Sequence, residues 1–360
     1  MKRIIATVTN DLTFDRRMQR ICRTLATDGY SVTLVGRALT ASKPFEPEPY
    51  KQYRLKCWFN KGKLFYIEFN LRLFWYLLWQ KADIVCAVDL DTIAPAFVVG
   101  GWKRWKRVYD AHEYFSEVPE VVHRPRVKKT WEWVANTFIP KADLAYTVGP
   151  ALAGIFTERY GVPFHTIRNV PEEVAELIVP KETGYILYQG ALNKGRGLEA
   201  LLQAMQQLDL KLKIAGEGDL SAELRQMAKD LGVQHKVEFL GFVKPGDLPE
   251  LTAGAWLGLN LLENMGLSYY YSLANKCFDY IQAEVPAVHM DFPEYRTLVE
   301  KYPVAVLLKE LSAPAIVTMI KHLQLQLDVY SGLKVACRNA KNLFIWQIEA
   351  GNLLKLYRDI

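Results

Sequence analysis

The segment Tyr188–Leu202, YQGALNKGRGLEALL, has the residue types that can hold a diphosphate. Its pattern predicts a strand over 185–189, a tight loop with three glycines and two cations, and then a helix. Glycines let the backbone approach a bound group, N–H groups at a helix start carry partial positive charge, and Lys194 and Arg196 add full charges. The spacing fits neither a Walker A loop nor a G-x-G-x-x-G fingerprint. A diphosphate site and a plain glycine-rich connection with solvated cations both stay open.

A second group of polar residues follows the strand predicted over 107–110. His112 lies there beside Glu113 and close to Asp110. A loop histidine in such a place can orient or polarise a substrate, or act as an acid or a base. A surface histidine that caps a turn is the alternative interpretation.

Two further segments have residues that suit a nucleotide. Asn275 and Asp279 are spaced i, i+4 in a helix predicted over 272–283, so they share one face. A carboxylate there can accept hydrogen bonds from a ribose diol, or it can be an ordinary solvated acid. Gly216-Glu217-Gly218 follows a predicted strand and precedes a helix, where it can admit a ligand or simply make a turn.

The elements that must position these residues alternate along the whole chain as short β-branched strands and apolar-periodic helices. The predicted fold class is therefore α/β, with two doubly wound Rossmann-like domains that face a central cleft. Ligands of such sheets bind at the carboxyl ends of the strands. Asn10, Asp89 and His112 would then lie on one side of the cleft, and Lys194 and Arg196 on the other.

The strands are expected at 3–9, 30–35, 83–88, 107–110, 144–148, 164–168, 185–189, 212–215, 237–240, 257–261, 287–290 and 305–308. The first helix is expected to begin at about Phe14. A proline-containing acidic segment over 169–180 predicts a linker, which gives an N-terminal domain of residues 1–172 and a C-terminal domain of residues 173–342.

Composition excludes several classes of protein. The 360 residues are 50% hydrophobic and have a formal net charge of +6, which suits anionic small molecules or a membrane face and is weak evidence for nucleic acid. The five cysteines show no disulfide or zinc-ligand spacing, which favours a reducing cytoplasm. The longest apolar run, 73–79, is too short to span a bilayer, and no signal peptide is indicated. We expect a cytoplasmic protein, soluble or peripheral to the membrane, with no nucleic-acid partner.

Aromatic residues and cations mix in two places, 64–79 and 102–107. The alternation over 50–67 suggests strands, and the pattern over 69–80 predicts a helix. The mixture is typical of a surface that meets an anionic membrane. A packed helix with snorkelling cations explains it equally well.

In their order and spacing, these segments resemble a GT-B glycosyltransferase of glycosyltransferase family 4, over nearly the whole chain. The first half contributes TNDLTFDRRMQRICRTLATDGYSVTLVGR, VDLDT, YDAHEYFSE and IRNVP. The second half contributes YQGALNKGRGLEALL, IAGEGDL, VEFLGFVKPGDLPEL and SYYYSLANKCFDYIQAEVPAV.

The resemblance implies roles for individual residues. Arg196 matches the phosphate-binding cation, with Lys194 in support; Asp279 takes the acidic position near the ribose; and His112 matches the cleft histidine near the transferred sugar. The other implied donor-side residues are Gly190, Glu217, Val243, Tyr271, Asn275 and Lys276, with Val243 in the segment near the base. On the acceptor side they are Asn10, Asp11, Arg16, Asp89 and Glu113.

Two positions depart from the family pattern. Ala191 stands where the family often has an arginine after the glycine that ends the strand, and Tyr271 stands where its first paired glutamate would fall. Glu263 lies upstream of that position, out of register. A family enzyme would also end with a helix that returns to the N-terminal domain, for which residues 343–360 are suited.

The implied activity is transfer of a sugar, with retention at the anomeric carbon, from a nucleotide-sugar to the hydroxyl of a sugar or lipid-linked acceptor. Cell-surface polysaccharide or glycolipid synthesis at the inner face of the membrane would be the setting, with no metal and no cofactor. Two alternatives stay open: a nucleotide-sugar epimerase on the same fold, and a non-catalytic relative that binds a nucleotide or a partner.

Overall fold

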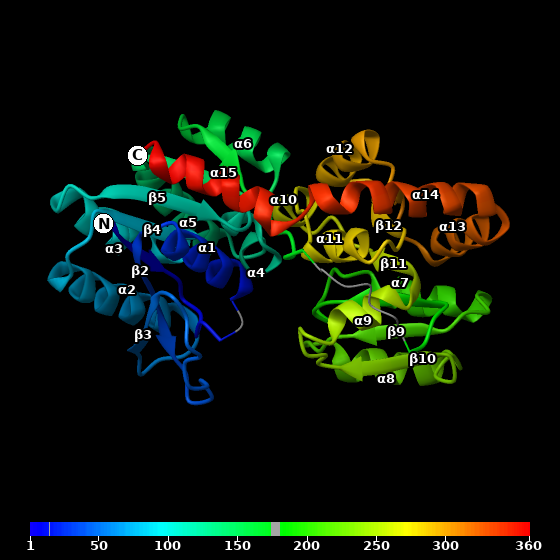
Figure 1. Cartoon of the computed structure of the whole chain (residues 1–360). Helices are drawn as coiled ribbons and strands as arrows, with labels where there is room; N and C mark the ends of the chain where they lie inside the picture. The colour runs from blue at the N-terminus through cyan, green and yellow to red at the C-terminus, as the bar shows by residue number, and fades with distance from the viewer. Residues whose placement is uncertain (14, 174–180) are drawn as a thin grey trace. The chain divides into compact units, whose positions relative to one another are not determined.

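The computed structural model describes residues 1–13, 15–173 and 181–360 (Figure 1). Phe14, the expected start of the first helix, and residues 174–180 of the expected linker lie outside this part. The chain divides into two compact units, one of Met1–Asn169 with Ile348–Ile360, the other of Val170–Gln347. The unit boundaries fall at 169/170 and 347/348, against expected domain boundaries at 172/173 and 342/343.

The first unit is built on a parallel sheet of seven strands in its described part, in the order β3-β2-β1-β4-β5-β6-β7. The strands are β1 (Arg3–Thr7), β2 (Ser31–Ala38), β3 (Lys51–Lys56), β4 (Ile84–Val88), β5 (Lys106–Ala111), β6 (Leu144–Thr147) and β7 (Phe164–Thr166). The chain starts in the middle at β1, runs to one edge, and returns to the other side of β1 at β4. The carboxyl ends of β1 and β4 therefore form a topological switch point, where ligands of doubly wound sheets bind.

The helices of the first unit are α1 (Arg16–Thr27), α2 (Gly62–Trp79), α3 (Leu90–Trp102), α4 (Pro119–Val122), α5 (Pro125–Phe138), α6 (Pro150–Tyr160) and most of α15 (Trp346–Arg358). α1 shows how the sequence sets them. The Asp15 carboxylate accepts a hydrogen bond from the Met18 N–H at 3.0 Å and caps the first turn. Met18, Ile21 and Leu25 form the buried stripe, and the helix ends before Gly29, whose φ of +96° favours glycine.

The second unit repeats the plan with six parallel strands among its described residues, in the order β10-β9-β8-β11-β12-β13. The strands are β8 (Tyr185–Gln189), β9 (Leu212–Ala215), β10 (Val237–Gly241), β11 (Ala255–Asn260), β12 (Ala287–Met290) and β13 (Ala305–Leu308). The helices are α7 (Leu198–Ala204), α8 (Ser221–Asp230), α9 (Leu248–Ala253), α10 (Leu267–Tyr270), α11 (Asn275–Gln282), α12 (Pro293–Lys301), α13 (Ala313–Leu325) and α14 (Leu327–Ala340). The prediction of two doubly wound α/β domains is confirmed.

One expectation is wrong. Residues 62–67 are expected to contain strand, but β3 ends at Lys56 and α2 begins at Gly62. The apparent alternation arises because α2 has apolar residues on two sides. Phe65, Phe69, Leu73 and Leu77 follow each other at i, i+4 spacing and are all buried, which is a helical period.

The end of the chain is fixed into the first unit through α15. Glu349 is 1% exposed, and its carboxylate accepts hydrogen bonds from the Arg168 backbone N–H at 3.2 Å and from Arg168 Nη1 at 3.0 Å. The Tyr357 hydroxyl lies 3.3 Å from that of Tyr146 in the core. These contacts tie α15 to the carboxyl-terminal part of the first sheet.

We predict that Glu349→Ala lowers the free energy of unfolding by about 2 kcal/mol, because it leaves Arg168 with two unmatched donors. Asp28→Ala, which removes the half-buried partner of the exposed Arg358, should have a much smaller effect on stability. Urea denaturation followed by circular dichroism measures both. Equal effects of the two variants would contradict the importance of the buried contact.

Candidate active site

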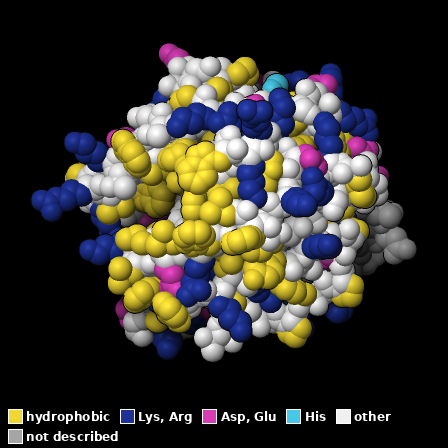
Figure 2. Space-filling model, turned by 90° about the vertical axis from the view of Figure 1, so that its left-hand side faces the viewer, with side chains coloured by type: hydrophobic (Ala, Val, Ile, Leu, Met, Phe, Trp, Pro, Cys, Tyr) yellow, Lys and Arg dark blue, Asp and Glu magenta, His cyan; other side chains and the backbone are white. Residues whose placement is uncertain are grey.

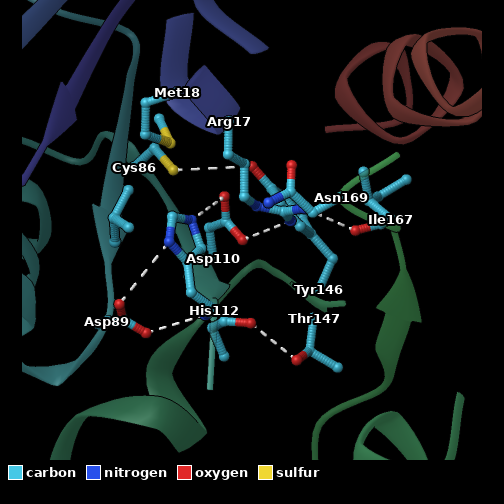
Figure 3. Close-up of polar contacts among 12 residues, drawn as sticks. Arg17, Met18, Cys86, Asp89, Asp110, His112, Tyr146, Thr147, Ile167 and Asn169 are labelled. Atoms are coloured by element: carbon cyan, nitrogen blue, oxygen red, sulfur yellow. Dashed lines mark hydrogen bonds and ion pairs between the residues drawn. The ribbon is translucent and has the colours of Figure 1, made fainter. Parts of the chain in front are cut away.

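The centre of the first unit's site is His112, which directly follows β5. Its backbone N–H donates to Asp89 Oδ1 at 2.9 Å, and its Nε2 lies 3.2 Å from Asp110 Oδ2. Nδ1 lies 3.9 Å from Asp89 Oδ2, so the ring is placed between two carboxylates (Figure 3). The side chain keeps 24% of its surface exposed. His112 is therefore held in one orientation and can still be reached.

Asp110 is held in turn by a buried arginine. Arg17 Nη2 lies 2.9 Å from Asp110 Oδ1, and Arg17 Nη1 donates to the Ile167 carbonyl at 2.8 Å. Both side chains are almost fully buried. Figure 3 shows Arg17 from α1 and His112 from the β5 loop on opposite sides of the Asp110 carboxylate. Arg17 is a site residue that the sequence prediction missed.

The charges in this cluster determine what His112 can do. Burial alone would lower the pKa of His112, but the carboxylates of Asp110 and Asp89 outweigh it and raise the pKa to about 9. Burial also raises the pKa of Asp110, but Arg17 and His112 hold it below its ordinary value. At neutral pH His112 is thus an imidazolium beside an ionised Asp110. Such a group places positive charge and orients neighbours, and it is not available to accept a proton.

Two more acids border this cluster at the switch point. Asp89 precedes α3 with a φ of +55°, and burial raises the pKa of its carboxyl group. Asp91 accepts a hydrogen bond from Thr9 Oγ1 at 2.5 Å, and its pKa is raised to about 6 by burial. Asp89 was predicted as a site residue, whereas Asp91 was not. The D-x-D spacing after a buried strand was the only signal for it.

The remaining acceptor-side predictions lie around the loop between β1 and α1 or on the surface. Asn10 Nδ2 donates to Asp15 Oδ2 at 2.6 Å, and Asp11 Oδ1 accepts from the Thr13 N–H at 3.0 Å. These side chains build the loop itself. Arg16 and Glu113 are exposed. The structure therefore brings Asp89 to His112 and gives Asn10 and Asp11 a structural role in the loop.

In the second unit, two glycines bring the ends of β8 and β9 into direct backbone contact. Gly190 has a φ of +138° and Gly216 one of +149°, so both favour glycine. A Cβ added to Gly216 would lie 1.9 Å from the Gly190 carbonyl oxygen. No side chain fits there, so both positions require glycine, and the backbones after β8 and β9 pack against each other at the carboxyl end of the sheet.

Two cations lie beside this backbone, each over a tyrosine ring. Lys276 Nζ is 3.8 Å from the centre of the Tyr188 ring, and Arg196 Cζ is 4.8 Å from that of Tyr269. Lys276 is 8% exposed, and burial, reinforced by Arg196, lowers its pKa well below the ordinary value. Arg196 Nε is buried without a hydrogen-bond partner among the described residues. Two basic side chains that lie over rings, one of them with a buried N–H without a partner among the described residues, suit an anionic ligand.

The other donor-side predictions are distributed around this point. Asp279 Oδ2 accepts from Gln189 Nε2 at 2.8 Å, which ties α11 to the last residue of β8. Glu217 lies on the loop that contacts Leu192, but its carboxylate pairs with Arg225 at 2.8 Å, and that hydrogen bond lowers its pKa.

Four more donor-side residues lie at the margins. Lys194 and Asn275 are exposed. Val243 lines a cavity of about 500 Å³ with Leu240 and Phe242. The Tyr271 ring packs edge-on against Tyr270, with ring centres 5.0 Å apart.

Comparison with models of known protein families identifies the family of this chain. The model of Glycosyltransferase Family 4 matches residues 15–172, and that of Glycosyl transferases group 1 matches residues 169–324. The chain belongs to the group 1 glycosyltransferases. The two matches are consecutive in the sequence of the transferase. They overlap at residues 169–172, next to the boundary between the two units at 169/170.

Solved structures and a curated relative agree with this assignment. Sucrose-phosphate synthase from Thermosynechococcus elongatus superposes with a TM-score of 0.81 at 17% identity, covering 100% of the transferase and 99% of that chain. Anabaena HepE in complex with UDP-glucose gives 0.79 at 15% identity, covering 100% of both chains. These likenesses show the GT-B fold.

The curated relative is N-acetylgalactosamine-N,N'-diacetylbacillosaminyl-diphospho-undecaprenol 4-alpha-N-acetylgalactosaminyltransferase of Campylobacter jejuni. It is 40% identical to the transferase over 78 residues, which are 21% of each chain. The matches to curated relatives span only 19% to 21% of those proteins' length.

We predict that Asp110→Asn lowers the pKa of His112 well below about 9, because burial is then opposed only by the Asp89 carboxylate. NMR titration of the imidazole C–H resonances measures this. Asp11→Asn, which removes a carboxylate that faces Thr13, should leave the pKa of His112 unchanged. An unchanged pKa in Asp110→Asn would show that Asp110 does not charge the histidine.

The same shift predicts a pH-dependent stability. The folded pKa of His112 lies above its unfolded value, so its contribution is full below about pH 6.5 and is lost as the pH rises through about 9. His112→Gln should therefore destabilise the protein more at about pH 6 than at about pH 10. Urea denaturation of both proteins at the two pH values measures the difference. An effect that grows with pH would contradict a charged His112.

Proposed function

We propose that this glycosyltransferase moves a sugar, with retention at the anomeric carbon, from a nucleotide-sugar donor to an acceptor hydroxyl. One observation carries the donor assignment. Arg196 and Lys276 lie over tyrosine rings, and Lys276 Nζ reaches the glycine-containing loop that follows β8 at Gly190. The arrangement gathers two basic side chains at a glycine-containing loop that leads into a helix, which suits a diphosphate. Anabaena HepE, which shares the fold, forms a complex with UDP-glucose, and this favours a uridine nucleotide here.

The proposed chemistry needs the diphosphate to leave. The bond between the anomeric carbon and the diphosphate oxygen breaks, and the acceptor oxygen forms its bond to the same face of that carbon. The acceptor proton passes to the leaving phosphate oxygen. Arg196, Lys276 and the N–H groups of the loop stabilise the negative charge that develops there, so the transfer proceeds without a metal ion.

In this mechanism His112 places charge and orients neighbours, and it takes no proton. Its ring is an imidazolium fixed by Asp110 and Asp89, at the carboxyl end of β5. The family pattern puts this histidine near the transferred sugar, where a fixed positive charge would stabilise the negative charge that develops on the departing diphosphate. Asp89 and Glu113 then border the acceptor side, and the Asp89 carboxylate can accept hydrogen bonds from sugar hydroxyls.

We further propose a sugar or lipid-linked acceptor, in the synthesis of a cell-surface polysaccharide or glycolipid at the inner face of the membrane. The name of the Campylobacter jejuni relative describes transfer to a sugar carried on diphospho-undecaprenol. A lipid-linked acceptor requires the enzyme to work at a membrane surface. The test is incubation with radiolabelled nucleotide-sugars and a lipid extract, where absence of any labelled lipid or glycan would count against transfer.

We predict that Arg196→Ala weakens UDP binding at least tenfold, or about 1.4 kcal/mol, because a charge-assisted contact to phosphate is lost. Lys194→Ala, at an exposed position of the same loop, should have a smaller effect. Lys321→Ala, an exposed lysine on α13, should have none. Isothermal titration calorimetry gives the affinities, and unchanged UDP binding by Arg196→Ala would overturn the diphosphate assignment.

A further inference from the structure

Helix α2 of the first unit has two apolar faces, of which the fold uses one. Phe65, Phe69, Leu73 and Leu77 point inward and are at most 5% exposed. They pack α2 on α3 and β3. The other face consists of Leu64, Ile67, Leu71, Trp75 and Trp79, which we call the α2 outer face. These five side chains are 48% to 83% exposed.

Exposed aromatic rings extend the α2 outer face on both sides. Trp58 is stacked under Arg72, whose Cζ lies 4.7 Å from the ring centre. Trp102 packs edge-on against Phe74, which also packs against Trp75. Figure 2, viewed from the side of the first unit where α2 and α3 lie in Figure 1, shows hydrophobic side chains gathered over a broad area with Lys and Arg around it. Such a large exposed apolar area marks an interaction surface.

Basic residues predominate in the segment that contains this surface. Residues 51–81 contain seven Lys or Arg and a single acid, Glu68. Glu68 is already used, because its carboxylate accepts from the Trp58 and Phe59 backbone N–H groups and from Arg72. Lys61, Lys63 and Lys81 are exposed at the two ends of the helix. The rim is therefore cationic, and it fits an anionic partner.

The geometry excludes one mode of membrane binding and favours another. Among the described residues, no helix has the length and apolarity to cross a bilayer. α2 has 18 residues and is about 27 Å long, and its inner face is occupied by the fold. It can therefore only lie along a surface. Lys103 Nζ donates to the Leu78 and Gln80 carbonyls at 2.5 and 2.6 Å, so the end of the helix already has partners for its carbonyls.

We propose that the α2 outer face, with Trp58 and Trp102, docks on the surface of an anionic phospholipid bilayer. The tryptophan rings would lie at headgroup depth, the leucine and isoleucine side chains at the acyl boundary, and Lys61, Lys63 and Lys81 on lipid phosphates. A protein partner fits less well, because protein interfaces are depleted in lysine. The inference deepens the proposed function, from which it takes only the expectation of a lipid-linked acceptor.

The test is flotation of the full chain with vesicles of phosphatidylcholine alone and of phosphatidylcholine with about 30% phosphatidylglycerol. The wild type should float with the anionic vesicles, and about 0.5 M salt should weaken this binding. Trp75→Ser with Trp79→Ser should reduce it at least tenfold. The matched control is Leu325→Ser with Leu327→Ser, because these residues of the second unit are 80% and 69% exposed.

Variants that reverse the charge of the rim lysines test the basic part of the surface separately from its apolar part. Lys61→Glu, Lys63→Glu and Lys81→Glu together should abolish binding to the anionic vesicles. The control, Lys321→Glu with Lys334→Glu, changes exposed lysines of the second unit and should bind normally. A wild type that fails to float, or a tryptophan variant that floats unchanged, overturns the proposal. So does a wild-type dimer in sedimentation that the tryptophan variant dissociates, since the face then binds a second copy.

Titration of the same proteins with UDP tests the proposed donor site independently of vesicle binding. The α2 variants should bind UDP as the wild type does, because the donor residues lie in the second unit. A wild type that binds vesicles but no UDP would contradict the donor site alone. A wild type that binds UDP but no vesicles would contradict the docking surface alone.

Discussion

The buried ion pair between Arg17 and Asp110 is the interaction on which the first unit's site depends. It joins α1 to the end of β5, and its second N–H group holds the Ile167 carbonyl after β7. Removing one partner of such a pair leaves a buried charge unmatched, which is strongly destabilising. The pair also fixes the charge state of its surroundings, because an ionised Asp110 keeps His112 protonated. The same ion pair therefore stabilises the fold of the first unit and sets the charge of His112.

The two units carry buried charges of opposite sign at the carboxyl ends of their sheets. At the switch point of the first sheet, acids outnumber bases, and Asp89 and Asp91 have raised pKa values because burial opposes their charge. Beside Gly190 in the second unit, cations gather, and Lys276 has a lowered pKa for the same physical reason. A surplus of one charge in a buried place costs stability, and a ligand of the opposite charge relieves it. A diphosphate carries the opposite charge to the basic site, whereas neutral hydroxyl groups match the acidic site by donating hydrogen bonds to its carboxylates.

The sequence was sufficient for the sheets because their strands are continuous β-branched runs between helical patterns, and this signal is local. It was also sufficient for the glycines of the loop after β8, which have positive φ. It was not sufficient for Arg17, since Arg16 beside it is equally basic, and only the helical register of α1 decides which one is buried. The aromatic and basic composition of residues 64–79 indicates a membrane-facing surface or a packed helix, but it does not tell which side chains of α2 point outward. Apolar residues on both sides of one helix cancel the periodicity that identifies a helix.

The two departures from the family pattern have a structural answer in the second unit. Residue 191 is alanine, but Lys276 from α11 reaches the same loop, with Nζ 3.2 Å from where a Cβ of Gly190 would be. The acid expected at 271 is tyrosine, but the Glu263 backbone N–H donates to the Gly195 carbonyl at 3.0 Å. A carboxylate therefore stays close to the loop, near Lys194. Position in space, and not register in the sequence, decides which side chains surround a ligand. Lys276 and Glu263 thus place ionisable groups beside this loop, although residues 191 and 271 carry none of the charges that the family pattern has there.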